Sequence, residues 1–156
     1  MNPDVLLGIL SNLYVNGGTY GSPTWAAVGL VGDMQLPAKW DVVEVPVRLS
    51  RLKLKAKTMM DCGITGKLLS SATNTLYTTL RAAMLGDDVL DVMALNGGND
   101  QNGCRGFRFD VQVVNTSQDL GTGVVVFDDF ELIPVFTVNT PKSVLVTSGA
   151  PVLTAF

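Results

Sequence analysis

The sequence predicts a mainly β domain with one helix, and three stretches carry this prediction. From Phe107 to Val113 apolar and polar residues alternate, and a period of two is typical of a half-buried strand. A second apolar run at 124–130 follows a glycine-rich turn at 121–123, and the two runs together predict an antiparallel pair. At 74–85 the apolar residues recur at helical spacing instead, which predicts the helix.

The N-terminal segment predicts strands joined by a polar loop. Residues 1–16 are apolar without a clean period, which fits either a strand or a docking arm. Residues 16–23 are rich in turn-forming residues and predict a loop. The segment from Trp25 to Val31 is typical of a strand that Gly29 weakens.

The stretch from Asp41 to Lys57 changes its alternation near Ser50. Apolar residues occupy odd positions before Ser50 and even positions after it. A one-residue phase change exchanges the two faces of a strand, and a β-bulge or a sharp bend is the physical device that produces it. We therefore expect a projecting arm over about residues 48–63, with a basic face that includes Arg51, Lys53, Lys55 and Lys57. The alternative is a solvated edge strand, because lysines on an edge block unwanted pairing.

The middle of the chain predicts two strands around the helix. Residues 64–69 have the length and composition of a short strand. The helix at 74–85 is expected to take its C-cap from Gly86. A strand at 89–95 follows, and then a polar loop at 96–103 that has neither the lysine nor the following helix of a phosphate-binding loop.

The C-terminal segment at 135–156 is apolar and carries one charge. It predicts short strands at 144–146 and 152–156, separated by turn-forming residues at 148–151. We treat 135–156 as a C-terminal extension of one domain, because no stretch of the chain has the composition of a linker.

Composition argues for a structural protein rather than an enzyme. Charged residues make up only 16% of the chain, which fits a surface that other subunits cover, or a glycine-rich β protein with uncharged loops. The chain has no histidine, so the commonest general base and the commonest transition-metal ligand are missing. Its adjacent carboxylates, Asp87 with Asp88 and Asp128 with Asp129, would point to opposite faces of a strand and make poor catalytic dyads. We expect no cofactor and no metal.

Cysteine usage and the N-terminus limit where the protein resides. Cys62 and Cys104 match no metal-binding or redox spacing, so they are buried thiols of a protein made in the cytosol or, alternatively, a disulfide. No basic residue precedes Lys39, which argues against a secretory signal. No apolar run approaches the roughly 20 residues of a membrane span, so we expect no membrane insertion.

Charge is unevenly distributed along the chain. Residues 39–67 hold seven basic and three acidic residues, whereas residues 68–156 hold four basic and nine acidic residues. Opposite patches on one subunit favour head-to-tail contact with another copy. The alternative is that the charge blocks cancel in the folded chain. The net charge of −3 argues against a general nucleic-acid binder.

The ordered set of motifs over about residues 15–134 resembles the phage major tail tube proteins. The segment from Thr19 to Trp25 is similar to the opening of that family. A basic-flanked strand, a short strand, one helix with Tyr77 and Leu80, a glycine loop leading to Gly103, and an acidic strand ending in Pro134 follow in the family's order. The last two dozen residues have no counterpart in it.

The resemblance implies a β-sandwich or barrel-like pair of sheets flanked by one helix. It implies a subunit that forms rings, as hexamers, in which inner sheets join into a ring-wide β-barrel. The rings would stack into a tube that carries DNA, in the virion tail, after assembly in the host cytoplasm. Other tail proteins would contact the tube ends.

Two sets of residues are expected to serve that assembly. The arm residues Arg48, Arg51, Lys53, Lys55 and Lys57 are the candidate subunit interface. Asp110, Asp128, Asp129 and Glu131 are the candidate lumen residues, because basic groups there would bind phosphates and stall DNA. The alternatives are another virion β protein, such as a head decoration or adaptor protein, and the tube subunit of a contractile injection system.

Overall fold

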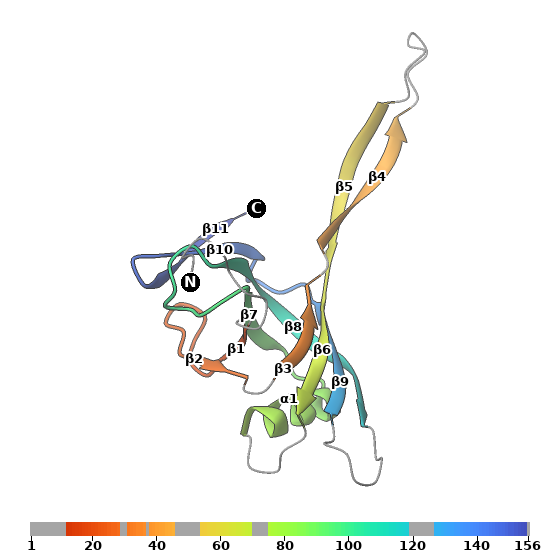
Figure 1. The fold of residues 1–156 in the computed structure, drawn as a ribbon. Helices are drawn as coiled ribbons and strands as arrows, with labels where there is room; N and C mark the ends of the chain where they lie inside the picture. The colour runs from red at the N-terminus through yellow and green to blue at the C-terminus, as the bar shows by residue number, and fades with distance from the viewer. Residues whose placement is uncertain are drawn as a thin grey trace.

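A computed structural model of the 156-residue chain describes residues 12–28, 31–36, 38–45, 54–69, 75–118 and 127–155. These residues confirm the predicted class, mainly β with one helix (Figure 1). The elements are β1 (Asn12–Asn16), β2 (Trp25–Ala27), β3 (Val31–Gln35), β4 (Ala38–Val45), β5 (Leu54–Cys62), β6 (Ile64–Leu69), α1 (Thr75–Gly86), β7 (Leu90–Leu95), β8 (Arg105–Gln118), β9 (Phe127–Pro134), β10 (Lys142–Thr147) and β11 (Ala150–Ala155).

The main sheet is built around β8, the longest strand. Its order is β2-β1-β7-β8-β9-β6-β3, and its described pairings are antiparallel. One edge of β8 pairs with β7, while the other edge pairs first with β10 at 105–108 and then with β9 at 111–118. A register shift between Val113 and Asn115 lies within the β8–β9 pair. The predicted antiparallel pair is therefore confirmed, and the predicted turn at 121–123 lies outside the described residues.

The sheet around β7 is buried on both faces. Leu13, Val15, Val92 and Ala94 belong to one core cluster, which also contains Leu80 and other side chains from α1, β6, β8 and β9. The residues that alternate with them, including Tyr14 and Met93, belong to a second cluster under the β10–β11 hairpin. A strand with two buried faces has a continuous apolar run rather than an alternating one. This explains why β1 shows no clean period in the sequence.

Helix α1 is confirmed almost at its predicted bounds, but its C-terminal cap differs from the prediction. The left-handed residue that ends the helix is Asp87, with φ of 59°, and not Gly86. The backbone N–H of Asp88 donates to the carbonyl of Ala83 at 3.2 Å, which is the six-to-one bond of a Schellman motif. Aspartate tolerates this conformation better than most non-glycine residues do. The predicted start at residue 74 lies outside the described residues.

The C-terminal segment is part of the main sheet. Strands β10 and β11 form a hairpin, and β10 is hydrogen bonded to β8. The turn between them has positive φ at both central residues, Ser148 (54°) and Gly149 (73°). This is the backbone of the two-residue turns that match the twist of a hairpin. The strand expected from Trp25 to Val31 is instead divided between β2 and β3, which pair with different partners.

Candidate functional site

The described residues contain no group of three or more histidine, cysteine, aspartate or glutamate side chains placed to hold a metal ion. No helix in this part of the chain is long and apolar enough to cross a membrane. The surfaces with unusual chemistry are instead a projecting hairpin, a sheet edge and a polar sheet face. The functional site is therefore best sought among surfaces that contact other molecules.

The hairpin of β4 and β5 continues the β3–β6 pair of the body outwards. Gln35 lies opposite Thr65 in the body, and Ala38 lies opposite Cys62 at the start of the hairpin. Gly63 separates β5 from β6 at this junction. Figure 1 shows β4 and β5, in orange and yellow, extending together away from the rest of the ribbon. We call this hairpin, residues 38–62, the arm.

The position of the arm corrects the predicted one. The expected strand ran through Asp41 and left the sheet near Ser50, whereas the arm begins at Ala38 and returns to the body at Gly63. Val45 pairs with Leu54, so the change of phase falls between two antiparallel strands and not at a bulge within one strand. Ser50 itself lies outside the described residues.

Apolar side chains on the arm are exposed to solvent. Val43 lies opposite Ala56, whereas Val42 lies opposite Lys57 on the other face. The exposed fractions are 41% for Trp40, 54% for Val42, 52% for Val43 and 42% for Val45. The Nζ atom of Lys57 lies 5.4 Å from the centre of the Trp40 ring, a cation–π contact. The described strands of the arm, residues 38–45 and 54–62, are called the stem. The stem has exposed apolar surface on both faces, and no other described strand or helix packs over it.

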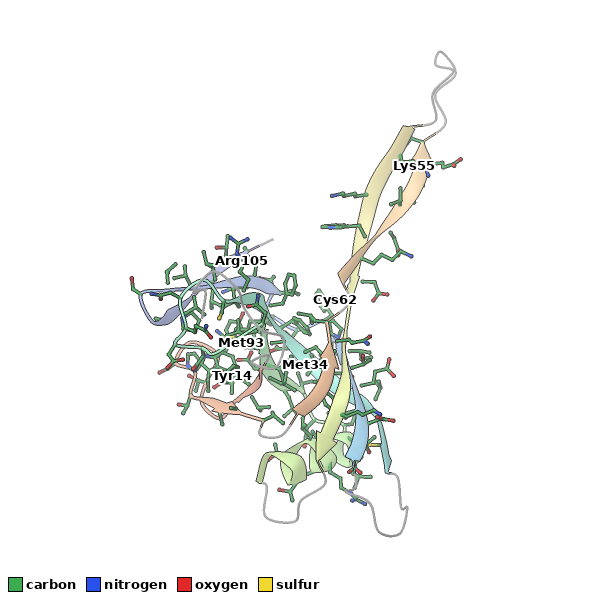
Figure 2. The ribbon with its side chains drawn as sticks, viewed as in Figure 1. Tyr14, Met34, Lys55, Cys62, Met93 and Arg105 are labelled. Atoms are coloured by element: carbon green, nitrogen blue, oxygen red, sulfur yellow. The ribbon has the colours of Figure 1, made fainter. Side chains whose placement is uncertain are left out.

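Charge on the described stem of the arm is balanced. Its basic residues are Lys39, Lys55 and Lys57, and its acidic residues are Asp41, Glu44 and Asp61. The register sets Lys39 opposite Asp61 and Glu44 opposite Lys55. Figure 2 shows Lys55 far out on the arm and Cys62 at its base. Arg48, Arg51 and Lys53, which make residues 39–67 basic overall, lie outside the described residues.

Two of the four predicted lumen residues are buried inside the subunit. Asp110 is 5% exposed and accepts hydrogen bonds from Oγ1 of Thr137 at 2.6 Å and from Nδ2 of Asn139 at 3.0 Å. Asp128 is also 5% exposed and lies on the core side of β9. The expectation that these two carboxylates face a lumen is corrected, because both are buried in the single chain and residues 137–139 cover Asp110.

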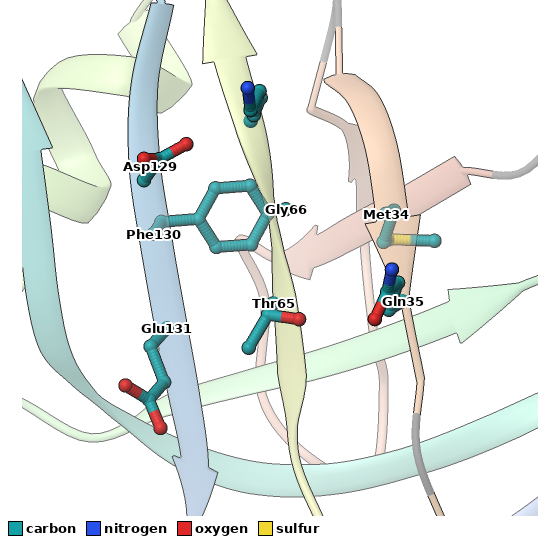
Figure 3. Close-up of a pocket in the computed structure, with 8 residues that line it drawn as sticks. Met34, Gln35, Thr65, Gly66, Asp129, Phe130 and Glu131 are labelled. Atoms are coloured by element: carbon teal, nitrogen blue, oxygen red, sulfur yellow. The ribbon is translucent and has the colours of Figure 1, made fainter. Parts of the chain in front are cut away.

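The other two acidic residues lie on an exposed face of the sheet. Asp129 and Glu131 alternate with buried Phe130 along β9, and the register sets Asp129 opposite Lys67. They border a groove of about 660 Å³ across β9, β6 and β3 (Figure 3). The Phe130 ring lies across Gly66, where a Cβ atom would approach the ring to 3.0 Å. Among the described strands, β3 ends this sheet.

A buried arginine is the main polar feature that the sequence pattern missed. Arg108 is 2% exposed and donates to Asp91 from Nε at 3.0 Å and from Nη2 at 2.6 Å. Its Nη2 also donates to the carbonyl of Tyr20 at 2.8 Å, and its guanidinium lies 3.9 Å from the Tyr20 ring centre and 5.0 Å from that of Trp25. The predicted solvent face of β8 is thus covered at this point by the loop after β1. Alternation alone carries no signal for such a lid.

Both cysteines are free, buried thiols in different core clusters. Burial raises the pKa of the Cys62 thiol, and the nearby Asp61 carboxylate adds to the rise. Burial likewise raises the pKa of Cys104, with Asp100 adding to it. A raised pKa keeps both sulfurs protonated and unreactive near neutral pH. The arrangement therefore gives neither cysteine the properties of a nucleophile.

Solved structures share this fold. A gene transfer agent tail refined with C6 symmetry matches with a TM-score of 0.61 and 9% identity, over 80% of this chain and 92% of that one. The SPP1 tail tube matches with a TM-score of 0.67 and 5% identity, over 85% and 77%. The anti-feeding prophage baseplate matches with a TM-score of 0.56 and 10% identity, over 88% and 92%.

Comparison of the sequence with known proteins finds no relative, although comparison of the structure does. No protein-family model matches the chain, and no curated protein matches it. Identities of 5% to 10% show shared architecture rather than shared activity. The chain has the fold that these tail, tail tube and baseplate structures share.

Proposed function

We propose that this chain is the structural subunit of a phage or phage-derived tail tube. Copies would self-assemble into rings, and the rings would stack into a tube that conducts DNA. The observation that carries the proposal is the arm, a two-stranded hairpin whose apolar side chains Trp40, Val42, Val43 and Val45 are exposed and lie under no other described element. An isolated hairpin of this kind is marginally stable in water, so a partner that covers it would stabilise it.

Burial of the arm by a neighbouring copy would provide substantial interaction free energy. Covering a valine or a larger apolar side chain contributes about 1.5–3 kcal/mol when the burial is complete. Trp40, Val42, Val43 and Val45 are each half-exposed, so part of that gain is still available. The balanced charge of the described stem favours this burial, because opposite charges lie across from each other on the two strands. The candidate interface thus shifts from the predicted lysine face to the whole stem.

Among the described strands, β3 is an edge of the main sheet, and this supports closure of the sheet across subunits. An unpaired edge strand is a template for pairing with another chain, and closing the sheets into a ring-wide barrel removes such edges. In this arrangement the face of β3, β6 and β9 would line the lumen. Asp129 and Glu131 would then present negative charge to passing DNA. Acidic groups do not bind phosphates, whereas basic groups bind them with release of counterions and would slow the DNA.

The wider setting follows from the same proposal. The similar gene transfer agent tail has C6 symmetry, which supports rings of six copies for this chain. The subunit would reside in the virion tail, assemble in the host cytoplasm and contact other tail proteins at the tube ends. A catalytic activity has no part in this role, since the exposed chemistry serves contact between copies.

Electron microscopy of the purified protein at increasing concentration tests the proposal. We expect hollow rings and stacked tubes with a regular repeat. A protein that remains a stable monomer at high concentration in size-exclusion chromatography contradicts self-assembly. Single rings that never stack would support the head decoration or adaptor alternative instead.

A further inference from the structure

The segment between β9 and β10 presents two apolar side chains directly to solvent. Phe136 and Val138 are almost completely exposed, which is rare for an aromatic and a branched aliphatic residue so close together. The residues between and beside them, Thr137 and Asn139, point inwards to the body instead. We call Phe136 and Val138 the knob.

The knob is held in place by the buried carboxylate of Asp110. Thr137 and Asn139 both donate side-chain hydrogen bonds to Oδ2 of Asp110, and the backbone N–H of Val135 donates to its carbonyl at 2.9 Å. The N–H of Asn139 also donates to Oγ1 of Thr137 at 3.0 Å. Bonds to a charged acceptor are among the stronger hydrogen bonds in proteins. The two apolar side chains are therefore held outwards by a polar anchor, which lowers the entropic cost of placing them in a partner.

The same chain carries an apolar pocket that its own knob does not fill. The pocket has a volume of about 510 Å³ and lies between the β10–β11 hairpin and the segment that leads into the arm. Leu36, Phe107, Val144 and Leu145 supply most of its apolar lining, and Arg105 lies at the same site. Neither Phe136 nor Val138 contributes to this lining. Each copy thus offers one knob and one pocket at different places on its surface.

We propose that the knob of one copy occupies this pocket of the next copy. A projection that fits a pocket elsewhere on an identical molecule makes a head-to-tail contact, which repeats as a ring or a filament. The knob segment from 135 to 141 is uncharged, so it can enter an apolar pocket without burying an ion. The contact rests on the proposed function and adds to it a second subunit interface, separate from the arm.

Serine substitution of the knob measures the contribution of this contact. In Phe136→Ser we expect the protein concentration at half-assembly to rise about tenfold or more, because an aromatic side chain loses its burial. Leu85→Ser is the matched control, since Leu85 is an exposed apolar residue on α1 that belongs to neither the knob nor the pocket lining. Circular dichroism and the thermal midpoint should be unchanged in both variants, because both positions are exposed in the isolated chain.

The outcome separates this contact from the proposed function. If Phe136→Ser assembles at the wild-type concentration while the wild type forms rings, the knob contact is wrong and the proposed function stands. If the wild type itself never assembles, both fall. In Val138→Ser the protein concentration at half-assembly should rise as well, but by less than in Phe136→Ser. If both variants assemble at the wild-type concentration, the knob contact is overturned.

Cross-linking tests the predicted pairing directly. A Phe136→Cys copy mixed with a Leu145→Cys copy should form a disulfide-linked heterodimer under assembly conditions, and the native cysteines are buried. A Phe136→Cys copy mixed with a Leu85→Cys copy should form far less. Equal cross-linking in the two mixtures, or none in either while rings form, refutes the pairing.

Discussion

The body and the arm of this protein handle apolar side chains in opposite ways. In the body, β7 buries residues on both faces, against the cluster that includes α1 on one side and under the β10–β11 hairpin on the other. Among the described residues of the arm, β4 and β5 pair with each other and leave apolar residues exposed. The core of the body is thus buried within one chain, whereas in the proposed assembly a neighbouring copy would cover the arm. Changes in the body should cost folding, and changes in the arm should cost assembly.

The largest expected effect on the free energy of unfolding comes from a side chain added at Gly106, because this residue of β8 lies close against the backbone of β7. A Cβ atom at this position would overlap the backbone carbonyl of Ala94. Gly106→Val should therefore lower the free energy of unfolding by about 4 kcal/mol or more, or prevent folding. Chemical denaturation measures the effect. Gly21→Ala is the control, because no atom lies within 4 Å of its added Cβ. A Gly106→Val protein of normal stability would contradict the described register of β7 and β8.

The next effect concerns the buried ion pair beside the loop after β1. Arg108→Leu removes the ion-pair partner of Asp91 and leaves a largely buried carboxylate, to which the side-chain amide of Asn16 still donates a hydrogen bond. We expect a loss of about 3–5 kcal/mol in the free energy of unfolding. The double variant Arg108→Leu with Asp91→Leu should recover much of that loss, because the uncompensated charge is gone. A double variant less stable than the single one would show that the charge pair is not what holds this loop.

Polar substitution in the arm should separate assembly from folding. In Val43→Ser with Val45→Ser, we expect the concentration at half-assembly to rise by about tenfold or more, since two half-exposed valines no longer reach a neighbour. The free energy of unfolding of the monomer should change by no more than about 0.5 kcal/mol. Light scattering and denaturation measure the two quantities on the same samples. A large loss of monomer stability with unchanged assembly would reverse the roles given to arm and body.

The smallest expected effect is that of the two cysteine thiols on the free energy of unfolding at alkaline pH. Burial raises the folded-state pKa of Cys62 and Cys104 above the ordinary value of 9.0, so the protonated thiol is favoured by folding. This contribution is complete below pH 9 and is lost as the pH rises through the folded-state pKa. Cys104→Ala should therefore flatten the fall in stability above pH 9 and reduce the number of thiols labelled in the unfolded chain from two to one. Rapid labelling of both thiols in the native protein at pH 8 would contradict their burial.

Local patterns predicted the elements whose signal is contained in a few consecutive residues. The strand at 64–69 and the helix matched the structure because period and length are local properties. The start of the arm was misplaced because two antiparallel strands that follow each other in the sequence give the same change of phase as a bulge within one strand. The sequence between Val45 and Leu54 does not distinguish these two cases.

The polar sites were harder to predict because their partners are distant in the sequence. Arg108 donates a hydrogen bond to the carbonyl of Tyr20, which is 88 residues away in the sequence. Asp110 accepts a hydrogen bond from Thr137, which is 27 residues away. An alternating strand shows two faces but not what lies over either of them. For the same reason, Asp129 and Glu131 could not be separated in the sequence from buried Asp128 and Asp110. The folded chain makes that separation, because it buries Asp110 and Asp128 and leaves Asp129 and Glu131 exposed.

Hydrogen exchange of the arm backbone, before and after assembly, tests the division between body and arm most directly. In the isolated chain, amides of β4 and β5 should exchange fast, while those of β7 and the first half of β8 should be protected. On assembly, the arm amides should become protected and the body amides should change little. Arm amides that are equally protected in the monomer and in the assembled state would contradict the account, because the arm would then be complete without a second copy.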